Sequence, residues 1–359
     1  MIIKPIDQNK FLKIFQKYCC NSFVQKLINQ KKTKIIKEKG ELVDLKIKVL
    51  RAYYSSPQRF HKFVIRYRVK FKLINGDVKD FNIYAKAQDN IHQKDVKKVM
   101  EILLKNSFSE GRFRVQRPLF LQENGMVLFY QELLGRDFLG YFKKPTQEIE
   151  DYIRLAAQLL DKIHRIDFSS YFPFPSSQSI LEKNIAWAGR NIISLGRNLH
   201  LDEIQEEFLP LLKKRSKSLR TRIKPCLVHN DFSPDNIIIH EDYLGLLDFS
   251  IYKFADPVED LVSFMVRLIM IALRVPQKTY GHLSLSLKEA LKLNRIFLKE
   301  YIGGTHNKNL LKRINFYTII YFLGFAQYTL DFENNKEGAK ALINKAKEYA
   351  EGFHSFAHL

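Results

Sequence analysis

The strongest constraint on this chain is a segment in which Asp and Asn residues alternate with short apolar runs. Asp231 is followed after five positions by Asn236, and Asp248 lies twelve positions beyond Asn236. Apolar runs of two to four residues between polar turns are typical of buried strands, and three surround these side chains: residues 227–228, 237–239 and 244–247. Buried strands would hold the three polar groups rigidly.

The three residue types suit the transfer of a phosphoryl group from ATP. A carboxylate can orient an attacking hydroxyl and accept its proton, which is a role for Asp231. A neutral amide oxygen and a second carboxylate can hold Mg²⁺ against the phosphates, which are roles for Asn236 and Asp248. The segment therefore predicts an ATP- and Mg²⁺-dependent site.

The segment also resembles the aminoglycoside phosphotransferase and choline kinase superfamily, whose members have a His-x-Asp-x4-Asn loop. This chain has that loop from His229 to Asn236. The resemblance implies an α+β, bilobal, protein-kinase-like fold, with a small antiparallel sheet lobe followed by a larger, mainly helical lobe. It implies that Asp231 is the catalytic base. Asn236 and Asp248 would be the magnesium ligands, and His229 would brace the loop.

Residues beyond the loop refine this resemblance. Asp256-Pro257 and Asp260 match an Asp-Pro-x-x-Asp segment of the family, where these residues are mainly structural. Together with Phe249-Ser250, they place the chain closer to the aminoglycoside phosphotransferase branch.

The first half of the chain has the pattern of an antiparallel sheet. Three runs rich in β-branched and aromatic residues are separated by polar loops, one of them the turn signal Asn75-Gly76-Asp77: residues 45–53, 63–74 and 81–87. Lys86, near the end of the third run, is our candidate for binding the α- and β-phosphates. A helix over residues 94–105 follows, and Glu101 on it is the expected ion-pair partner of Lys86.

Two further nucleotide contacts are implied by the resemblance. After a strand at residues 126–129, backbone groups near Glu132 and Leu134 would bind adenine. The loop at residues 54–59 has no glycine, whereas glycine-rich loops let backbone amides approach phosphates closely. We therefore expect Ser55 and Ser56 to make that contact.

The second half of the chain reads as helical. Apolar residues recur at helical spacing in seven segments: 148–165, 180–199, 201–218, 261–275, 285–301, 310–330 and 336–353. We expect a nucleotide-binding lobe at residues 1–134, with a helical N-terminal extension, and a catalytic and acceptor-binding lobe at residues 135–359.

Some residues of these helices have two interpretations. His164 is expected to pack rather than to act in catalysis. Five aromatic residues either pack in the core, which we favour, or form a cage for a quaternary amine: Trp187, Tyr317, Tyr321, Phe325 and Tyr328.

The formal charge of +21 makes the surface attractive to anions. Seven of the twelve residues from Lys213 to Lys224 are basic. A solvated helix face is the favoured explanation, and contact with an anionic ligand or surface is the alternative; nucleic acid is an unlikely partner. No apolar run is long enough to span a bilayer, and three cysteines without metal spacing fit a reducing cytoplasm.

We therefore expect a small-molecule kinase whose acceptor is a hydroxyl of a sugar or aminocyclitol. Ser233 stands where protein kinases have Lys, so protein-kinase activity is not expected, and its role would be structural. Two alternatives stay open: a choline- or ethanolamine-type kinase, and a nucleotide-binding pseudoenzyme or basic scaffold without turnover.

Overall fold

The computed structural model describes residues 7–53, 61–88, 93–144, 146–219, 223–303 and 308–352. Its contacts divide the chain into two compact units. The first unit runs to Gly135 and also includes His240–Ile251, whereas the second comprises Arg136–Ile239 and the chain from Tyr252 onwards. His240–Ile251, which the sequence analysis assigned to the second lobe, thus groups with the first unit.

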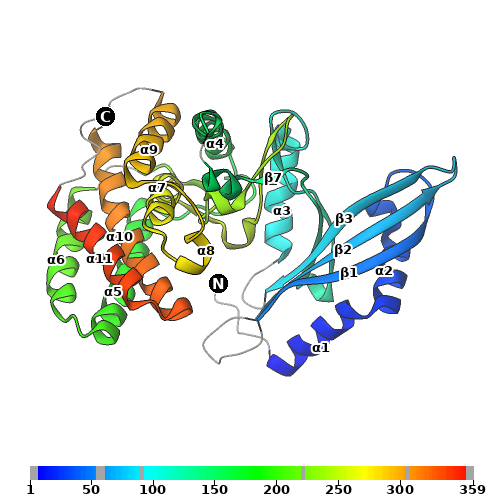
Figure 1. The fold of residues 1–359 in the computed structure, drawn as a ribbon, viewed down its shortest axis with the longest axis horizontal. Coiled ribbons are helices and arrows are strands. Elements are labelled where there is room, and N and C mark those ends of the chain that lie inside the picture. The colour runs from blue at the N-terminus through cyan, green and yellow to red at the C-terminus, as the bar shows by residue number, and fades with distance from the viewer. Residues whose placement is uncertain are drawn as a thin grey trace. The chain divides into compact units, whose positions relative to one another are not determined.

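The first unit is built on an antiparallel sheet with the strand order β1-β2-β3-β6-β5 (Figure 1). The strands are β1 (Gly40–Tyr53), β2 (Lys62–Leu73), β3 (Val78–Gln88), β5 (Pro118–Gln122) and β6 (Val127–Gln131). The helices are α1 (Gln8–Cys19), α2 (Asn21–Ile35) and α3 (Gln93–Leu103). The three predicted antiparallel strands and the helix after them are confirmed, although β1 begins at Gly40 rather than at Leu45.

The sequence of β2 explains why this strand buries one of its faces more than the other, whereas β6 is buried on both. Burial alternates along the strand, with Phe63, Tyr67 and Phe71 on the face covered by α1 and α2. The hydroxyl of Tyr67 donates to the carbonyl of Tyr18 at 2.8 Å. Basic side chains occupy the opposite face, so a one-residue slip would turn every apolar side chain outward.

A parallel strand pair ties the later segment to the first unit. β4 (Phe113–Val115) pairs with β10 (Leu244–Leu246), and Asp248 follows β10 directly. The short apolar run before Asp248 is therefore a buried strand, as its sequence predicts.

The second unit is mainly helical. Its helices are α4 (Glu148–His164), α5 (Ser177–Leu199), α6 (Glu203–Ser218), α7 (Val258–Leu273), α8 (Gln277–Tyr280), α9 (Leu287–Ile302), α10 (Lys308–Glu333) and α11 (Lys336–Glu351). Two short antiparallel pairs accompany them: β7 (Arg136–Asp137) with β9 (Ile237–Ile239), and β8 (Cys226–Val228) with β11 (Lys253–Ala255). All seven predicted helices are present, and α8 is an addition.

Helix α7 lies in the core of the second unit and packs against α9 and α10. Apolar side chains of α7 cover almost its whole circumference, which is typical of a helix with little contact with water. Across the described ranges, no helix combines the length and apolar character needed to cross a bilayer.

Candidate active site

In the first unit, Lys86 and Asp248 form an ion pair. Lys86 extends from β3, is 6% exposed, and donates its Nζ to Oδ1 of Asp248 and to Oγ of Ser250, the latter at 3.0 Å. Asp248 has a φ of 61°, which non-glycine residues rarely adopt and which is frequent at functional sites. The structure thus brings together two of the residues selected from the sequence.

A second lysine, Lys62 at the start of β2, lies beside this pair. Its Nζ is 4.0 Å from Oδ2 of Asp248. Burial, together with the charge of Lys86, lowers the pKa of Lys62 to about 8, although Asp248 opposes this shift. Lys62 was not selected from the sequence, because it precedes the predicted strand of residues 63–74 and nothing distinguishes it from the other basic residues nearby.

The ionisation of Asp248 depends on these two lysines. Burial alone would raise the pKa of its carboxyl group, but Lys86 and Lys62 hold the pKa well below its usual range. Hydrogen bonds from Lys86 and Ser250 contribute to the same lowering. An anionic Asp248 is the form that a cation requires.

The expected ion pair between Lys86 and Glu101 is wrong. Glu101 lies exposed on α3 and accepts a hydrogen bond from Lys97, one turn earlier on the same helix. The helix exists where it was predicted, but Lys86 pairs with the carboxylate after β10 instead. Helical spacing alone did not determine the direction in which Glu101 points. An error of one residue in the helix register rotates a side chain by about 100° around the helix axis.

In the connector, the residues 132–135 after β6, the Glu132 side chain makes hydrogen bonds, whereas some backbone groups make none among the described residues. The Glu132 carboxylate accepts hydrogen bonds from Asn82 at 2.7 Å and from Tyr84 at 2.6 Å. Within the described ranges, the carbonyl of Glu132 and the amide of Leu134 make no hydrogen bond. Ser55 and Ser56, the other residues selected for the nucleotide, lie outside the described residues.

In the second unit, both oxygens of the Asp231 carboxylate accept hydrogen bonds. The amide nitrogen of Asn236 donates to Oδ2 at 2.9 Å and to the Asp231 carbonyl at 2.8 Å. The guanidinium of Arg267 donates to Oδ1 at 3.2 Å. Because the Asn236 amide nitrogen faces Asp231, its amide oxygen is free to face a cation.

Arg267 on α7 is the main residue that the sequence analysis missed. Its guanidinium stacks 4.5 Å from the ring centroid of Phe325 and lies 4.0 Å from Asp235, which accepts from Tyr280 at 3.1 Å. Burial would lower the pKa of Arg267, but Tyr280, Asp235 and Asp231 outweigh it and raise the pKa. The available signal was an Arg within an otherwise apolar helix, since a buried charge needs a partner.

The loop that carries Asp231 is anchored by Asp260. The buried Asp260 carboxylate accepts from the backbone N–H groups of His229 at 2.7 Å and Asn230 at 2.8 Å, and its Oδ2 lies 3.2 Å from Nε2 of His164. His164 is buried with this carboxylate at the end of α4, in agreement with its expected packing role. Asn230 has a φ of 67°, so the loop is strained next to Asp231.

The remaining residues of the motif are buried supports. Asp256 accepts from the Val258 N–H at 3.1 Å and from Arg313 at 2.8 Å. Ser233 is fully buried, and its carbonyl accepts from the Asn236 N–H at 3.0 Å. These contacts fix the backbone on both sides of the loop, and the structural roles expected for these residues stay predictions.

The side chains selected as possible binders elsewhere are mostly packed. Tyr317 is fully buried, Trp187 lies edge-on to Tyr321, and Phe325 stacks with Arg267. Among the basic residues at the end of α6, Arg215 donates to Asn315 and to the carbonyl of Ala350, whereas Lys213, Lys214 and Lys217 are exposed. Residues 220–222 lie outside the described residues.

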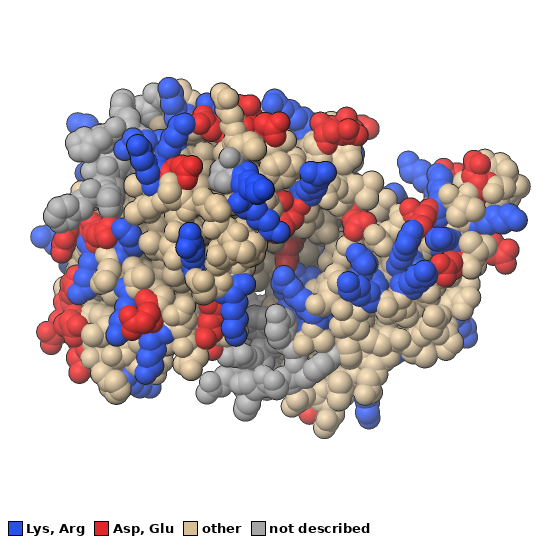
Figure 2. Space-filling model, in the orientation of Figure 1, with Lys and Arg blue, Asp and Glu red and all other residues tan. Residues whose placement is uncertain are grey.

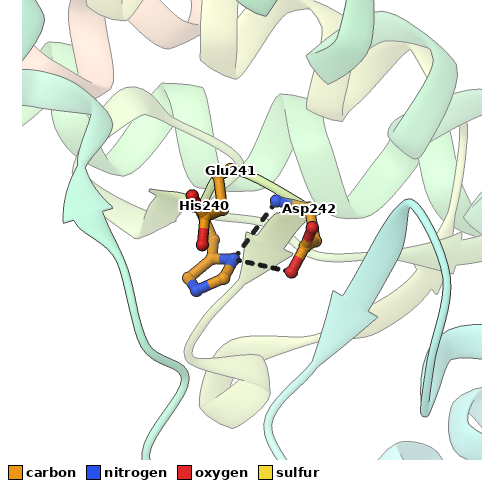
Figure 3. Close-up of side chains that lie close together, drawn as sticks. All are labelled: His240, Glu241 and Asp242. Carbon is orange, nitrogen blue, oxygen red and sulfur yellow. Dashed lines mark hydrogen bonds and ion pairs between the residues drawn. The ribbon is translucent and has the colours of Figure 1, made fainter.

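A second group of metal-type ligands occurs in the turn before β10. Atoms of His240, Glu241 and Asp242 lie within 4.8 Å of one another (Figure 3). Nδ1 of His240 accepts from the Asp242 N–H at 3.2 Å, so the turn's own hydrogen bond already accounts for this cluster. Glu241 and Asp242 are exposed, and we assign no cation to the group.

The donors in the motif match the preference of Mg²⁺ for oxygen. Asp248 offers an anionic carboxylate, and Asn236 offers an amide oxygen. In this structure Lys86 and Lys62 balance the negative charge of Asp248, and a bound cation would balance it in the same way. Each of the two residues, taken by itself, therefore offers the type of oxygen that magnesium binds.

Comparison with known proteins assigns the chain to a family. A family model described as the phosphotransferase enzyme family matches residues 87–292, more than half of the chain. The match begins one residue after Lys86 and includes Asp231, Asn236, Asp248 and Arg267. No curated protein matches the sequence.

Solved structures share the fold at low sequence identity. The streptomycin–ATP–APH(2")-IIa ternary complex is 16% identical, with a TM-score of 0.52, 92% of this chain covered and 98% of that chain. An ethanolamine kinase from Plasmodium vivax is 12% identical, with a TM-score of 0.52 and coverages of 84% and 81%. A choline kinase from Cryptosporidium parvum is 14% identical, with a TM-score of 0.53 and coverages of 86% and 89%.

These likenesses confirm the predicted α+β kinase-like fold. The family match confirms the predicted superfamily. The family match also confirms the predicted class of enzyme, a small-molecule kinase. The chain belongs to the phosphotransferase enzyme family.

Proposed function

We propose that the protein transfers the γ-phosphoryl group of ATP, in the presence of Mg²⁺, to a hydroxyl of a small sugar-like or aminocyclitol-like acceptor. The observation that carries this proposal is the Asp231 carboxylate, held by Asn236 and Arg267 on its two oxygens within the family-matched segment. A carboxylate fixed in this way is suited to orient a hydroxyl and take its proton.

The first unit supports the nucleotide side of the proposal. Lys86 and Lys62 together place two cationic groups around one carboxylate, Asp248. Lys86 would hold the α- and β-phosphates, and Lys62 would supply charge where the loop before it has no glycine. Phosphates would thus be held by side-chain charge more than by backbone amides.

The connector supports binding of the adenine base. The Glu132 carbonyl can accept from the adenine amine, and the Leu134 amide can donate to a ring nitrogen. The Glu132 side chain is held by Asn82 and Tyr84, so the backbone at this position is fixed before the nucleotide arrives. Fixed groups lose little conformational entropy on binding.

Asn236 and Asp248 would supply oxygen ligands to magnesium, which neutralises charge on the phosphates when it is bound. The chain's own residues do the rest of the chemistry. Asp231 would receive the proton as the acceptor oxygen attacks phosphorus and the bond to the leaving ADP oxygen breaks. Arg267 and Asn236 would keep the carboxylate of Asp231 in place during that attack.

The acceptor is the open part of the proposal. The related structures are a complex that contains streptomycin, an ethanolamine kinase and a choline kinase, so aminoglycosides and amino alcohols both belong in a test. The three cysteines are free, which suits a reducing compartment such as the cytoplasm, where ATP is also available.

ATP consumption should be measured across sugars, amino alcohols and aminoglycosides, with Asp231→Ala as the control. Acceptor-dependent ADP release that Asp231→Ala abolishes is the expected result. Release that survives this substitution would remove Asp231 from its role. ATP binding without consumption for any acceptor would favour the pseudoenzyme alternative.

A further inference from the structure

The end of the β2–β3 hairpin presents aliphatic side chains to water. Ile74 is 80% exposed and Val78 is 57% exposed, one on each side of the turn Asn75-Gly76-Asp77. Val43, the extra residue at a bulge in β1, is 53% exposed. The Ile74 N–H donates to the Lys39 carbonyl at 3.3 Å, so the hairpin end is joined to the segment before β1.

Within the part of the chain that the structure describes, exposed apolar side chains are unevenly distributed. Three of the eleven large apolar side chains classed as exposed lie at this hairpin end: Val43, Ile74 and Val78. Val49 and Leu50 lie at the opposite end of β1. Isolated exposed aliphatic residues are common on any surface, whereas a group at the end of a projecting element indicates a contact.

The exposed face of the same sheet carries more basic than acidic side chains, although Glu41 lies opposite Lys72 and Asp44 lies opposite Lys70. Lys46 and Lys48 on β1 lie opposite Arg68 and Arg66 on β2, and Lys72 lies near the turn. Lys46, Lys48 and Lys72 have no carboxylate within ion-pair distance among the described residues, whereas Arg68 pairs with Asp80 at 2.6 Å. Figure 2 shows many basic side chains on the strands of this unit.

Exposed aliphatic side chains next to unpaired lysines fit the boundary of an anionic lipid bilayer. Aliphatic groups can enter the region between headgroups and acyl chains, while lysines remain at the level of the phosphates. Single-stranded nucleic acid would instead need exposed aromatic rings for stacking. The aromatic residues of β2 and β3 near this end, Phe71 and Phe81, stack on each other; Phe71 belongs to the core, and Phe81 is partly buried against it.

We propose that the β2–β3 hairpin end and the basic face beside it dock on a membrane surface of anionic phospholipid. Ile74 and Val78 enter the interface, and Lys46, Lys48 and Lys72 contact headgroup phosphates. This surface contact does not depend on the proposed phosphotransfer, because Lys86, Asp231 and Asp248 take no part in it.

Flotation of the full chain with phospholipid vesicles tests this proposal. Vesicles of phosphatidylcholine containing a third phosphatidylglycerol should carry the protein, whereas pure phosphatidylcholine vesicles should carry much less. Raising the salt from about 50 to 200 mM should weaken the binding, because the charges are screened. Equal binding to both kinds of vesicle would contradict the proposal.

Matched variants distinguish a specific role of the hairpin from nonspecific apolar adsorption and from nonspecific charge attraction. Ile74→Ser should lower vesicle binding about tenfold, whereas Ile193→Ser, at an exposed position on α5, should not change it. Lys46→Gln with Lys72→Gln should lower binding about fivefold per lysine. Lys213→Gln with Lys214→Gln on α6 removes the same charge and should have a smaller effect.

The comparison between the two lysine pairs decides the location of the surface. An equal loss in the α6 pair would overturn the hairpin assignment, as would an unchanged result for Ile74→Ser. Circular dichroism and ATP binding should match the unaltered protein for every variant, because all of the substituted side chains are exposed. Hairpin-dependent binding of single-stranded RNA in the absence of vesicle binding would replace the lipid with nucleic acid.

Discussion

The two units carry side-chain groups of opposite electrostatic character. In the first unit, Lys62 and Lys86 surround a single carboxylate, Asp248, and the pKa of Lys62 is lowered to about 8. In the second, Asp231 and Asp235 share a single guanidinium, that of Arg267. An excess of cationic groups favours phosphate, whereas an excess of carboxylates favours hydroxyl or amine groups. The contrast agrees with our proposal, in which one unit would bind the phosphate donor and the other the acceptor.

The largest expected effect comes from the carboxylate of the second unit. Asp231→Asn should lower turnover about 10³-fold, because the amide cannot take the proton of the acceptor hydroxyl. ATP affinity should stay nearly constant, since Asp231 belongs to the acceptor half. Steady-state turnover and ATP titration give both values, and Asp242→Asn, at an exposed position, serves as the control. Unchanged turnover would break the assignment.

A structural effect should follow from the anchor below the loop. Asp260→Ala should lower the free energy of unfolding by about 3 kcal/mol, because two backbone N–H groups and His164 lose a buried acceptor. Urea unfolding measures the change, with Asp242→Ala as the exposed control. A change as small as that of the control would show that the loop does not depend on Asp260.

Substitution of Arg267 tests how much its contact with the Asp231 carboxylate contributes to turnover. Arg267→Met should lower turnover about thirtyfold by releasing one oxygen of the Asp231 carboxylate. Arg267→Lys retains the charge and should restore part of the turnover, while the KM for ATP should be unaffected by either change. A changed ATP KM with constant turnover would place Arg267 on the nucleotide side instead.

The smallest expected effect is the pH dependence of the first unit. The pKa of Lys62 is lowered to about 8, so this lysine is cationic below that pH and loses its charge above it. ATP affinity should therefore fall about tenfold between about pH 7 and 9, if only the charged lysine binds phosphate. Lys62→Met should bind more weakly at pH 7 and show a flatter profile in calorimetry. An equally steep profile in this variant would assign the dependence to another group.

The sequence predicted the fold largely because its signals were local. The alternation in β2 and the turn Asn75-Gly76-Asp77 define a hairpin without reference to the rest of the chain, and apolar spacing does the same for the long helices. The His-x-Asp-x4-Asn loop likewise has a fixed spacing, so Asp231 and Asn236 could be paired in advance. Contacts of this kind depend on neighbours in the sequence.

The residues that the sequence could not assign depend on long-range packing. Lys62 joins Asp248 only because the chain returns to β10 after more than a hundred residues, and Arg267 reaches Asp231 only because α7 lies in the core. Glu101 illustrates the opposite error: a suitable residue on a correctly predicted helix points elsewhere. Spacing along one element determines which residues share a face, but not what that face meets.

Calorimetric titration of Mg·ATP into Asp231→Ala and Asp248→Ala tests the division of labour most directly. The account predicts that Asp231→Ala binds the nucleotide nearly as the unaltered protein does. Asp248→Ala should lose magnesium-dependent affinity by more than about tenfold, because it removes a metal ligand. Equal ATP affinity with and without the Asp248 carboxylate would contradict the account.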